Sequence, residues 1–301
     1  MKIAIVGFGS AGKRHYDNFL KLGCELAVVS KRKVSADNLF LSVSECEKSF
    51  KPDLFFVCTE TSEHERTLIE IKNAGFTQKV IVEKPVFSQA PQGDYENYFA
   101  DIRVSYNFRF NSLLAKLKSE VKGQKVLTAT AYVGQYLPQW RPEADYRQSY
   151  SAKTERGGGV LLDLSHEFDY LHWLLGPSTG VFAMGGKLSD LEIDSEDIVN
   201  VLMQSESGAL VNVHLNYLDR NKNRYLILNT REATYKLNFV TREFSKDGET
   251  QVLEDDSSLA MAKDIVSNEA RGLTTYTDAL AILATVFQCR NSIAASAWVQ
   301  V

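Results

Sequence analysis

The sequence is poor in cysteine and proline and has no long hydrophobic run. Its four cysteines in 301 residues are scattered, with no C-x-x-C pair and no spacing typical of a metal site. Six prolines and the lack of any low-complexity tract exclude a disordered or fibrous chain. No apolar run approaches the roughly 20 residues that a membrane-spanning helix needs. We therefore expect free and mostly buried thiols, no bound metal and no membrane partner.

A strong charge of one sign is also lacking. The formal net charge of -4 is too small to create a general field that gathers nucleic acid or an anionic surface. The apolar run at residues 3–9 is too short for the hydrophobic region of a signal peptide and is broken by glycine. We expect a cytoplasmic protein that binds no nucleic acid.

The first part of the chain alternates short apolar runs with amphipathic stretches, which is typical of parallel strands joined by helices. Ser62 is placed to cap the second of two expected helices and Gly75 to end it. We predict an α/β Rossmann-type domain over residues 1–110. Its strands are expected at 2–8, 25–30, 53–59, 79–84 and 102–108, and its helices at 11–23 and 62–75.

The second part has longer runs of alternating polarity, which favour a mostly antiparallel sheet. We predict an α+β domain with an open, mostly antiparallel sheet over residues 111–301. The alternating runs lie at 125–134, 200–218, 224–230 and 233–240, and the expected helices at 112–123, 163–176 and 277–293.

The stretch GFGSAGKRH directly follows the first expected strand and opens the first expected helix. This context favours a dinucleotide-binding turn over an ordinary tight turn. Gly7 would permit the turn, Gly9 would let the backbone approach a pyrophosphate, and Gly12 would let helix and strand pack closely. The helix that starts at Ser10 and Ala11 would supply N–H donors and a positive dipole end.

The end of the second strand bears on which nucleotide is bound. NAD-binding domains usually place an acidic residue there to accept from the ribose hydroxyls. This chain has Ser30, Lys31 and Arg32 instead, a hydroxyl and two cations that suit a 2′-phosphate. We therefore expect NADP, with NAD as the alternative if the segment is only a solvated basic loop.

Four ordered segments resemble one family of enzymes. They are GFGSAGKRH, VCTETSEHERTLIEIKNAGFTQKVIVEKP, VSYNFRF and GGGVLLDLSHEFDYLHWLLG, and GALVNVHLNYLDR and DALAILATVFQCRNSI follow in the expected order. Together they resemble the Gfo/Idh/MocA family of glucose-fructose oxidoreductase, inositol dehydrogenase and rhizopine catabolism proteins. The resemblance implies an NAD(P)-dependent oxidoreductase that acts on a small sugar-type substrate at a CH-OH group. It also implies a homodimer or homotetramer that packs through the open sheet.

The resemblance further implies roles for particular residues. Glu83 and Lys84, followed by Pro85, match the family's signature, in which the lysine reaches the nicotinamide and the reacting oxygen. His166 matches the motif histidine, and an imidazole that titrates near neutrality suits proton exchange with a hydroxyl. Asp163 would be its partner carboxylate, three residues earlier where many members have four; a helix would keep both on one face.

Further positions are implied at the edge of the cofactor and around the substrate. Thr59 and His64 match a cofactor-edge turn and a histidine that opens the next helix, although Glu60 stands where proline or asparagine is common. A loop rich in aromatic and polar groups suits a sugar face, and its arginines suit a phosphate or carboxylate unless nearby acids pair with them. The expected substrate contacts are Trp140, Arg141, Tyr146, Arg147, Tyr150 and Asp169.

Two other functions fit the same pattern. The fold also serves dinucleotide-sensing regulatory proteins, and related members reduce imines or pigments such as biliverdin. The presence of both Lys84 and His166 favours catalysis, because a sensor would be free to lose either. The substrate loop and the D-L-S-H segment resemble members of the family that make surface sugars, and this resemblance implies a nucleotide-linked or sialic-acid-like sugar of surface polysaccharide synthesis.

Overall fold

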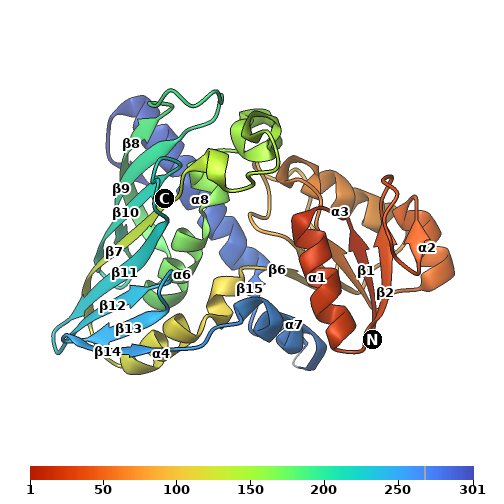
Figure 1. Ribbon diagram of the computed structural model, residues 1–301, viewed down its shortest axis with the longest axis horizontal. Coiled ribbons are helices and arrows are strands. Elements are labelled where there is room, and N and C mark those ends of the chain that lie inside the picture. The colour runs from red at the N-terminus through yellow and green to blue at the C-terminus, as the bar shows by residue number, and fades with distance from the viewer. Residues whose placement is uncertain (268) are drawn as a thin grey trace. The chain divides into compact units, whose positions relative to one another are not determined.

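The computed structural model describes residues 1–267 and 269–301, and it divides into two compact units (Figure 1). The first unit consists of Met1–Asn107 and Ser257–Ala279. The second consists of Phe108–Asp256 and Leu280–Val301. Residues 257–279, which the sequence analysis placed in the second domain, thus lie with the first unit.

The first unit has a seven-stranded sheet in the order β15-β6-β5-β4-β1-β2-β3. All neighbours pair in parallel except β15, which is antiparallel to β6. Strand β4 is apolar and buried throughout, and β1, β2 and β5 are so after their first residue, as expected of a sheet covered on both faces. Their bounds are β1 Lys2–Val6, β2 Glu25–Val29, β3 Leu39–Phe40, β4 Leu54–Val57, β5 Lys79–Val82, β6 Asp101–Val104 and β15 Thr274–Thr275.

The helices of the first unit are α1 Ser10–Lys21, α2 Val43–Phe50, α3 His64–Asn73 and α7 Ser257–Ser267. Helix α1 buries Gly12, His15 and Phe19, which lie on one helical face. Gly75 follows the end of α3 with a φ of 87°, as predicted. The prediction that Ser62 caps α3 is wrong, because the chain first makes a 3-10 turn, η1 Thr61–Glu63, and no side chain caps the helix.

The second unit has a nine-stranded sheet in the order β14-β13-β12-β11-β7-β10-β9-β8-β16. Only β7 and β10 pair in parallel, so the predicted mostly antiparallel sheet is confirmed. The bounds are β7 Val126–Gly134, β8 Ser178–Gly186, β9 Ile198–Ser205, β10 Leu210–Asn216, β11 Asn223–Thr230, β12 Thr234–Asn238, β13 Glu243–Lys246, β14 Glu249–Val252 and β16 Val299–Gln300.

Helices cover one face of this sheet, as the ribbon of α4, α6 and α8 shows in Figure 1. Burial along β9 alternates strictly, and outward-facing Met184, Leu202 and Leu210 are more than half exposed. The helical elements are α4 Ser112–Glu120, α5 Val160–Asp163, α6 His166–Leu175, α8 Tyr276–Ala295 and the 3-10 turns η2 Asn107–Phe110, η3 Leu137–Gln139, η4 Tyr146–Gln148, η5 Tyr150–Ala152 and η6 Thr154–Arg156.

All four cysteines are free and buried, as predicted. Among the described residues no helix is both long and apolar enough to span a membrane. The same residues contain no group of three or more His, Cys, Asp or Glu side chains arranged to hold a metal ion.

Candidate active site

The glycine-rich turn joins β1 to α1. Gly7 has a φ of 92°, and a Cβ there would lie 2.7 Å from the carbonyl oxygen of Cys58. A Cβ on Gly12 would lie 2.2 Å from the carbonyl oxygen of Gly7, whereas a Cβ on Gly9 would meet nothing within 4 Å. Gly7 and Gly12 thus allow strand and helix to pack, and Gly9 leaves open space beside the backbone. With no acid in its first turn, α1 can hold an anion.

Three turns of the first unit lie at one edge of its sheet. Strands β1, β4 and β5 are parallel and adjacent, and their carboxyl ends lead into Gly7, Thr59 and Glu83. The Glu83 N–H donates to the carbonyl of Val57 at 2.9 Å, which continues the sheet to that edge. In open parallel sheets this edge is where ligands bind.

Glu83 is a buried carboxylate with partners on both oxygens. Its Oε1 lies 2.6 Å from His15 Nε2 and 3.4 Å from Arg14 Nη2. Its Oε2 accepts from the backbone N–H of Lys84 at 2.9 Å. Burial acts to raise the pKa of Glu83, but the hydrogen bond and charge of His15, helped by Arg14 and Lys84, outweigh it and lower the pKa to about 2. The carboxylate is therefore ionised at all ordinary pH values.

His64 is also buried, with only 1% of its surface exposed. Its Nδ1 lies 3.1 Å from the carbonyl oxygen of Pro85 and 3.0 Å from that of Val86, and its Nε2 lies 3.2 Å from the carbonyl oxygen of Thr59. Burial lowers the pKa of His64, although the backbone contacts and Glu83 oppose this. The ring therefore contacts the backbone of two turns at the sheet edge.

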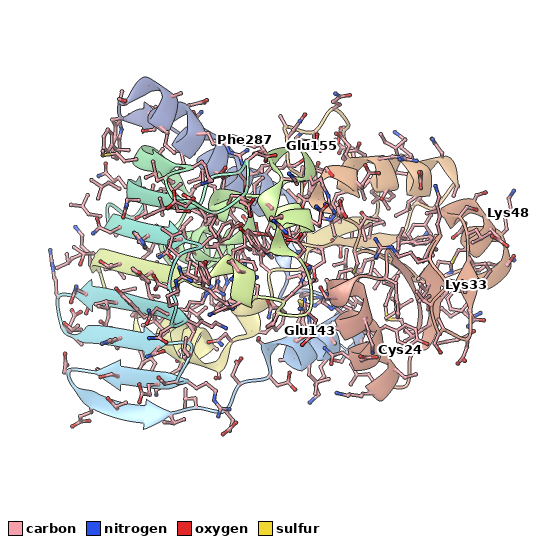
Figure 2. All side chains as sticks on the ribbon, turned by 45° about the horizontal axis from the view of Figure 1, so that its top comes forward. Cys24, Lys33, Lys48, Glu143, Glu155 and Phe287 are labelled. Carbon is pink, nitrogen blue, oxygen red and sulfur yellow. The ribbon has the colours of Figure 1, made fainter. Side chains whose placement is uncertain are left out.

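The loop after β2 carries the three residues expected to read the nucleotide. Ser30 Oγ accepts from the backbone N–H of Arg32 at 3.1 Å, which folds the segment into a tight turn. Lys31 and Arg32 are exposed, as is Lys33, which is labelled in Figure 2. No acidic residue stands at this end of the strand.

In the second unit, His166 begins helix α6 and is half-buried. The His166 ring packs on the Phe108 ring, with centroids 4.7 Å apart. The guanidinium of Arg224 lies 4.0 Å from the centroid of the Phe108 ring. Glu167 accepts from Arg224 Nε at 2.8 Å and from Nη2 at 2.9 Å. Phe108 and Arg224 therefore pack beside His166 and Glu167 at the start of α6.

Asp163 does not share a helix with His166. It ends α5, and Leu164 and Ser165 interrupt the helix before α6 begins, so the expected single helix over 163–176 is wrong. Asp163 is buried and accepts from the Tyr217 hydroxyl at 2.7 Å. Burial, and then the nearby Asp163, raise the pKa of both Tyr150 and Tyr217 well above the usual range. Both phenols therefore stay protonated and can donate to Asp163.

The expected substrate contacts separate into groups. Trp140 packs edge-on against Tyr217 with centroids 5.3 Å apart, and Arg141 acts electrostatically on Tyr150. Trp140 therefore contacts Tyr217, and Tyr150 lies beside Asp163 with Arg141 close enough to influence it. Exposed Arg147 pairs instead with Asp145 at 2.8 Å and with Glu192 at 3.1 Å, and the Tyr146 hydroxyl accepts from the Glu192 N–H at 3.2 Å.

Asp169 pairs with an arginine of the second unit. It is fully buried and forms an ion pair with Arg109, whose Nη2 is 2.9 Å from its Oδ1. A buried pair of this kind fixes the start of the second unit to α6.

Comparison with known proteins identifies the family. Residues 1–95 match the Gfo/Idh/MocA oxidoreductase family model of the NAD-binding Rossmann fold, and residues 117–235 match the family's C-terminal domain. The chain belongs to the Gfo/Idh/MocA family. The Gfo/Idh/MocA fold is thus confirmed for both units, and the protein has an NAD-binding Rossmann domain.

Solved structures share the fold across the whole chain. The WlbA dehydrogenase from Bordetella pertussis, in complex with NADH and UDP-GlcNAcA, is 19% identical with a TM-score of 0.84, over 100% of this chain and 97% of that one. A levoglucosan dehydrogenase in complex with NADH and levoglucosan is 17% identical with a TM-score of 0.84, over 100% and 99%. An uncharacterised oxidoreductase from Synechocystis sp. is 31% identical over 110 residues, 35% of this chain and only 30% of its own length.

Sequence reasoning missed several residues around the candidate site. His15 lies within the quoted glycine-rich stretch, and its spacing of three from Gly12 and four from Phe19 places it on the buried face of α1. Tyr217 and Arg224 flank the turn after β10 and meet Asp163 and Glu167 only through the fold. No local signal marks these contacts.

Proposed function

We propose that this protein is an NADP-dependent oxidoreductase that transfers a hydride between the nicotinamide and the carbinol or keto carbon of a sugar derivative. The observation that carries the proposal is the shared edge of the parallel sheet, where the glycine-rich turn, Thr59 and the Glu83–Lys84 segment meet. The open space at Gly9 and the N–H groups of Ser10 and Ala11 suit a pyrophosphate.

Oxidation of an alcohol releases a hydride, which bound nicotinamide accepts, and a hydroxyl proton, which needs a base. In the proposal, His166 takes that proton and the Lys84 ammonium stabilises the negative charge that develops on oxygen. In reduction the same groups act in the reverse direction. Asp163, which holds Tyr217 and lies beside Tyr150, keeps the loop that carries Tyr150 in place.

The cofactor assignment rests on the loop after β2. Ser30, Lys31 and Arg32 combine a hydroxyl, an ammonium and a guanidinium, which bind a 2′-phosphate better than a free ribose hydroxyl. Arg32→Ala should weaken NADPH binding about tenfold or more while NADH affinity changes little. Equal losses for the two nucleotides in a fluorescence titration would reject the NADP assignment in favour of NAD.

The proposed substrate is a sugar with an anionic group, such as a nucleotide-linked or sialic-acid-like sugar. Trp140, Tyr150 and Arg141 lie near Asp163, and an aromatic face beside a guanidinium suits a sugar ring that carries a phosphate or carboxylate. The structurally similar WlbA dehydrogenase is crystallised with UDP-GlcNAcA, which is such a compound.

The test is a fluorescence titration with NADPH and NADH, repeated with nucleotide sugars and free sugar acids, followed by turnover assays. Lys84→Ala and His166→Ala should each lower turnover by roughly 100-fold or more, with NADPH affinity within about threefold of wild type. Unchanged turnover in either variant would remove that residue from the mechanism. Tight dinucleotide binding with no turnover of any sugar would favour a sensor.

A further inference from the structure

The backbone around Lys84 is held from both sides by buried histidines of different helices. His15 of α1 is 1% exposed, stacks on Phe56 with centroids 4.4 Å apart, and lies 2.6 Å from Glu83 Oε1. The other oxygen of Glu83 accepts from the Lys84 N–H at 2.9 Å. The ring of His15 is thus connected to the Lys84 amide through a single carboxylate.

The proton arrangement at His15 follows from its surroundings. In this structure its buried Nδ1 has no hydrogen-bond partner among the described residues. The Glu83 carboxylate oxygen can only accept, so the hydrogen on His15 Nε2 is donated to it.

His64 of α3 contacts the chain just after Lys84. Its Nδ1 is within 3.1 Å of the carbonyl oxygens of Pro85 and Val86, and its Nε2 lies 3.2 Å from the carbonyl oxygen of Thr59. One ring therefore contacts the turn after β4 and the turn after β5, and its single N–H in the neutral form donates to one of them.

We propose that His15 and His64 are positioning residues that together fix Lys84 for its work at the reacting oxygen, an inference that rests on the proposed function. Both histidines lie on helices that start at cofactor-binding turns: α1 at the glycine-rich turn and α3 just after Thr59. The clamp made of His15, Glu83 and His64 therefore links the position of Lys84 to the same elements that hold the dinucleotide.

Burial and charge support a role beyond packing. Apolar side chains could fill both histidine positions without the cost of burying polar groups, and a buried charged carboxylate is expensive unless it is paired. The lysine side chain itself is long and flexible, so fixing its backbone on both sides is an effective way to limit where the ammonium can lie.

The experiment compares His15→Phe and His64→Phe with rescue variants and packing controls. His15→Gln and His64→Gln keep an N–H donor. Phe19→Leu and Leu68→Val alter buried apolar positions on the same two helices, and Phe19 contacts the same Phe56 ring as His15 does. Turnover, NADPH affinity, thermal unfolding and amide hydrogen exchange over residues 83–88 are measured for each variant.

Each phenylalanine variant should lower kcat about 10- to 100-fold while NADPH affinity stays within about threefold. The Lys84 and Val86 amides should exchange at least about tenfold faster, and the glutamine variants should recover most of both effects. The packing controls should show neither effect at a matched loss of Tm. Unchanged kcat and exchange in the phenylalanine variants, or equal changes in the controls, would overturn the clamp.

The exchange measurement separates this inference from the proposed function, because it needs no substrate. A wild-type protein that turns over no sugar, with amides that loosen only in the phenylalanine variants, would reject the function and keep the clamp. If a phenylalanine variant does not fold, Glu83→Gln replaces it, since it keeps the size and removes the charged acceptor, and the same results are expected.

Discussion

Glu83 keeps its charge inside the first unit because His15, Arg14 and the Lys84 amide surround it. The sequence predicted Glu83 and Lys84 as site residues because they form a motif contiguous in the chain. It could not predict the partner, because His15 lies 68 positions earlier and reaches Glu83 only after α1 packs on the sheet. The sequence therefore predicted which residues belong to the motif, but the partners of those residues depend on tertiary contacts.

Acid should destabilise the protein partly through Glu83. Its folded pKa of about 2 lies below the usual value of 4.5, so its stabilising contribution is complete well above pH 4.5 and is lost as pH falls toward 2. Between pH 6 and pH 3 the loss in unfolding free energy should be roughly 2 kcal/mol. Urea unfolding of wild type and Glu83→Gln at both pH values measures it, and an equal pH effect in both proteins would contradict it.

Tyr217 was missed by sequence reasoning although it contacts a predicted site residue. Tyr217→Phe removes the hydroxyl that donates to buried Asp163 at 2.7 Å and leaves the ring in place. The free energy of unfolding should fall by about 1–3 kcal/mol, because a buried carboxylate loses a donor. Tyr136→Phe, at a half-buried phenol whose ring packs on Arg220, is the control in urea melts and should cost less.

At the scale of elements, long periodic segments were predicted well and short or interrupted ones were not. Helices α1, α4 and α8 lie where the apolar period placed them. The segment from 160 to 175 has a continuous apolar pattern, yet it forms two helices because Leu164, with φ -99° and ψ 28°, leaves helical geometry. Periodicity records which side is buried, and it does not record where backbone hydrogen bonding is interrupted.

The turn between β1 and α1 gives a matched pair of substitutions. Gly12→Ala would place a Cβ 2.2 Å from a backbone oxygen, so we expect a loss of about 2–3 kcal/mol in unfolding free energy and weak NADPH binding. Gly9→Ala meets nothing within 4 Å, so stability should stay within about 1 kcal/mol. Its NADPH affinity should still fall, because the added methyl occupies the space beside the backbone.

Those two variants distinguish packing from binding. Thermal unfolding and NADPH titration are measured on both. If Gly9→Ala binds NADPH as wild type does, the pyrophosphate does not approach the backbone at this turn. If Gly12→Ala is as stable as wild type, the contact with Gly7 relaxes more easily than the geometry indicates.

At the scale of the whole molecule, the sequence predicted two architectures and the structure has both. It did not predict that residues 257–279 lie with the first unit, because β15 has two residues and shows no strand period. The uncovered face of the second sheet carries Met184, Leu202 and Leu210. Exposed apolar side chains on an open sheet favour association.

We expect a homodimer or homotetramer that uses this face. Light scattering should give a mass of two or four chains of 33.8 kDa each. Leu202 is 52% exposed, so Leu202→Lys should shift the mass toward one chain. The thermal midpoint of this variant should lie within about 2 °C of that of a monomeric reference variant. A wild-type mass of one chain would refute the prediction.

Strand β15 and helix α7 have a consequence for synthesis. Thr274 and Thr275 cover the outer edge of β6, and Ser258 of α7 accepts from Asn18 of α1 at 2.9 Å (Figure 1). A ribosome therefore releases most of the chain before the first unit has all its parts. We expect a fragment that stops at residue 110 to leave the β6 edge open and to self-associate. Nascent chains should acquire dinucleotide binding only once the residues beyond 275 have emerged.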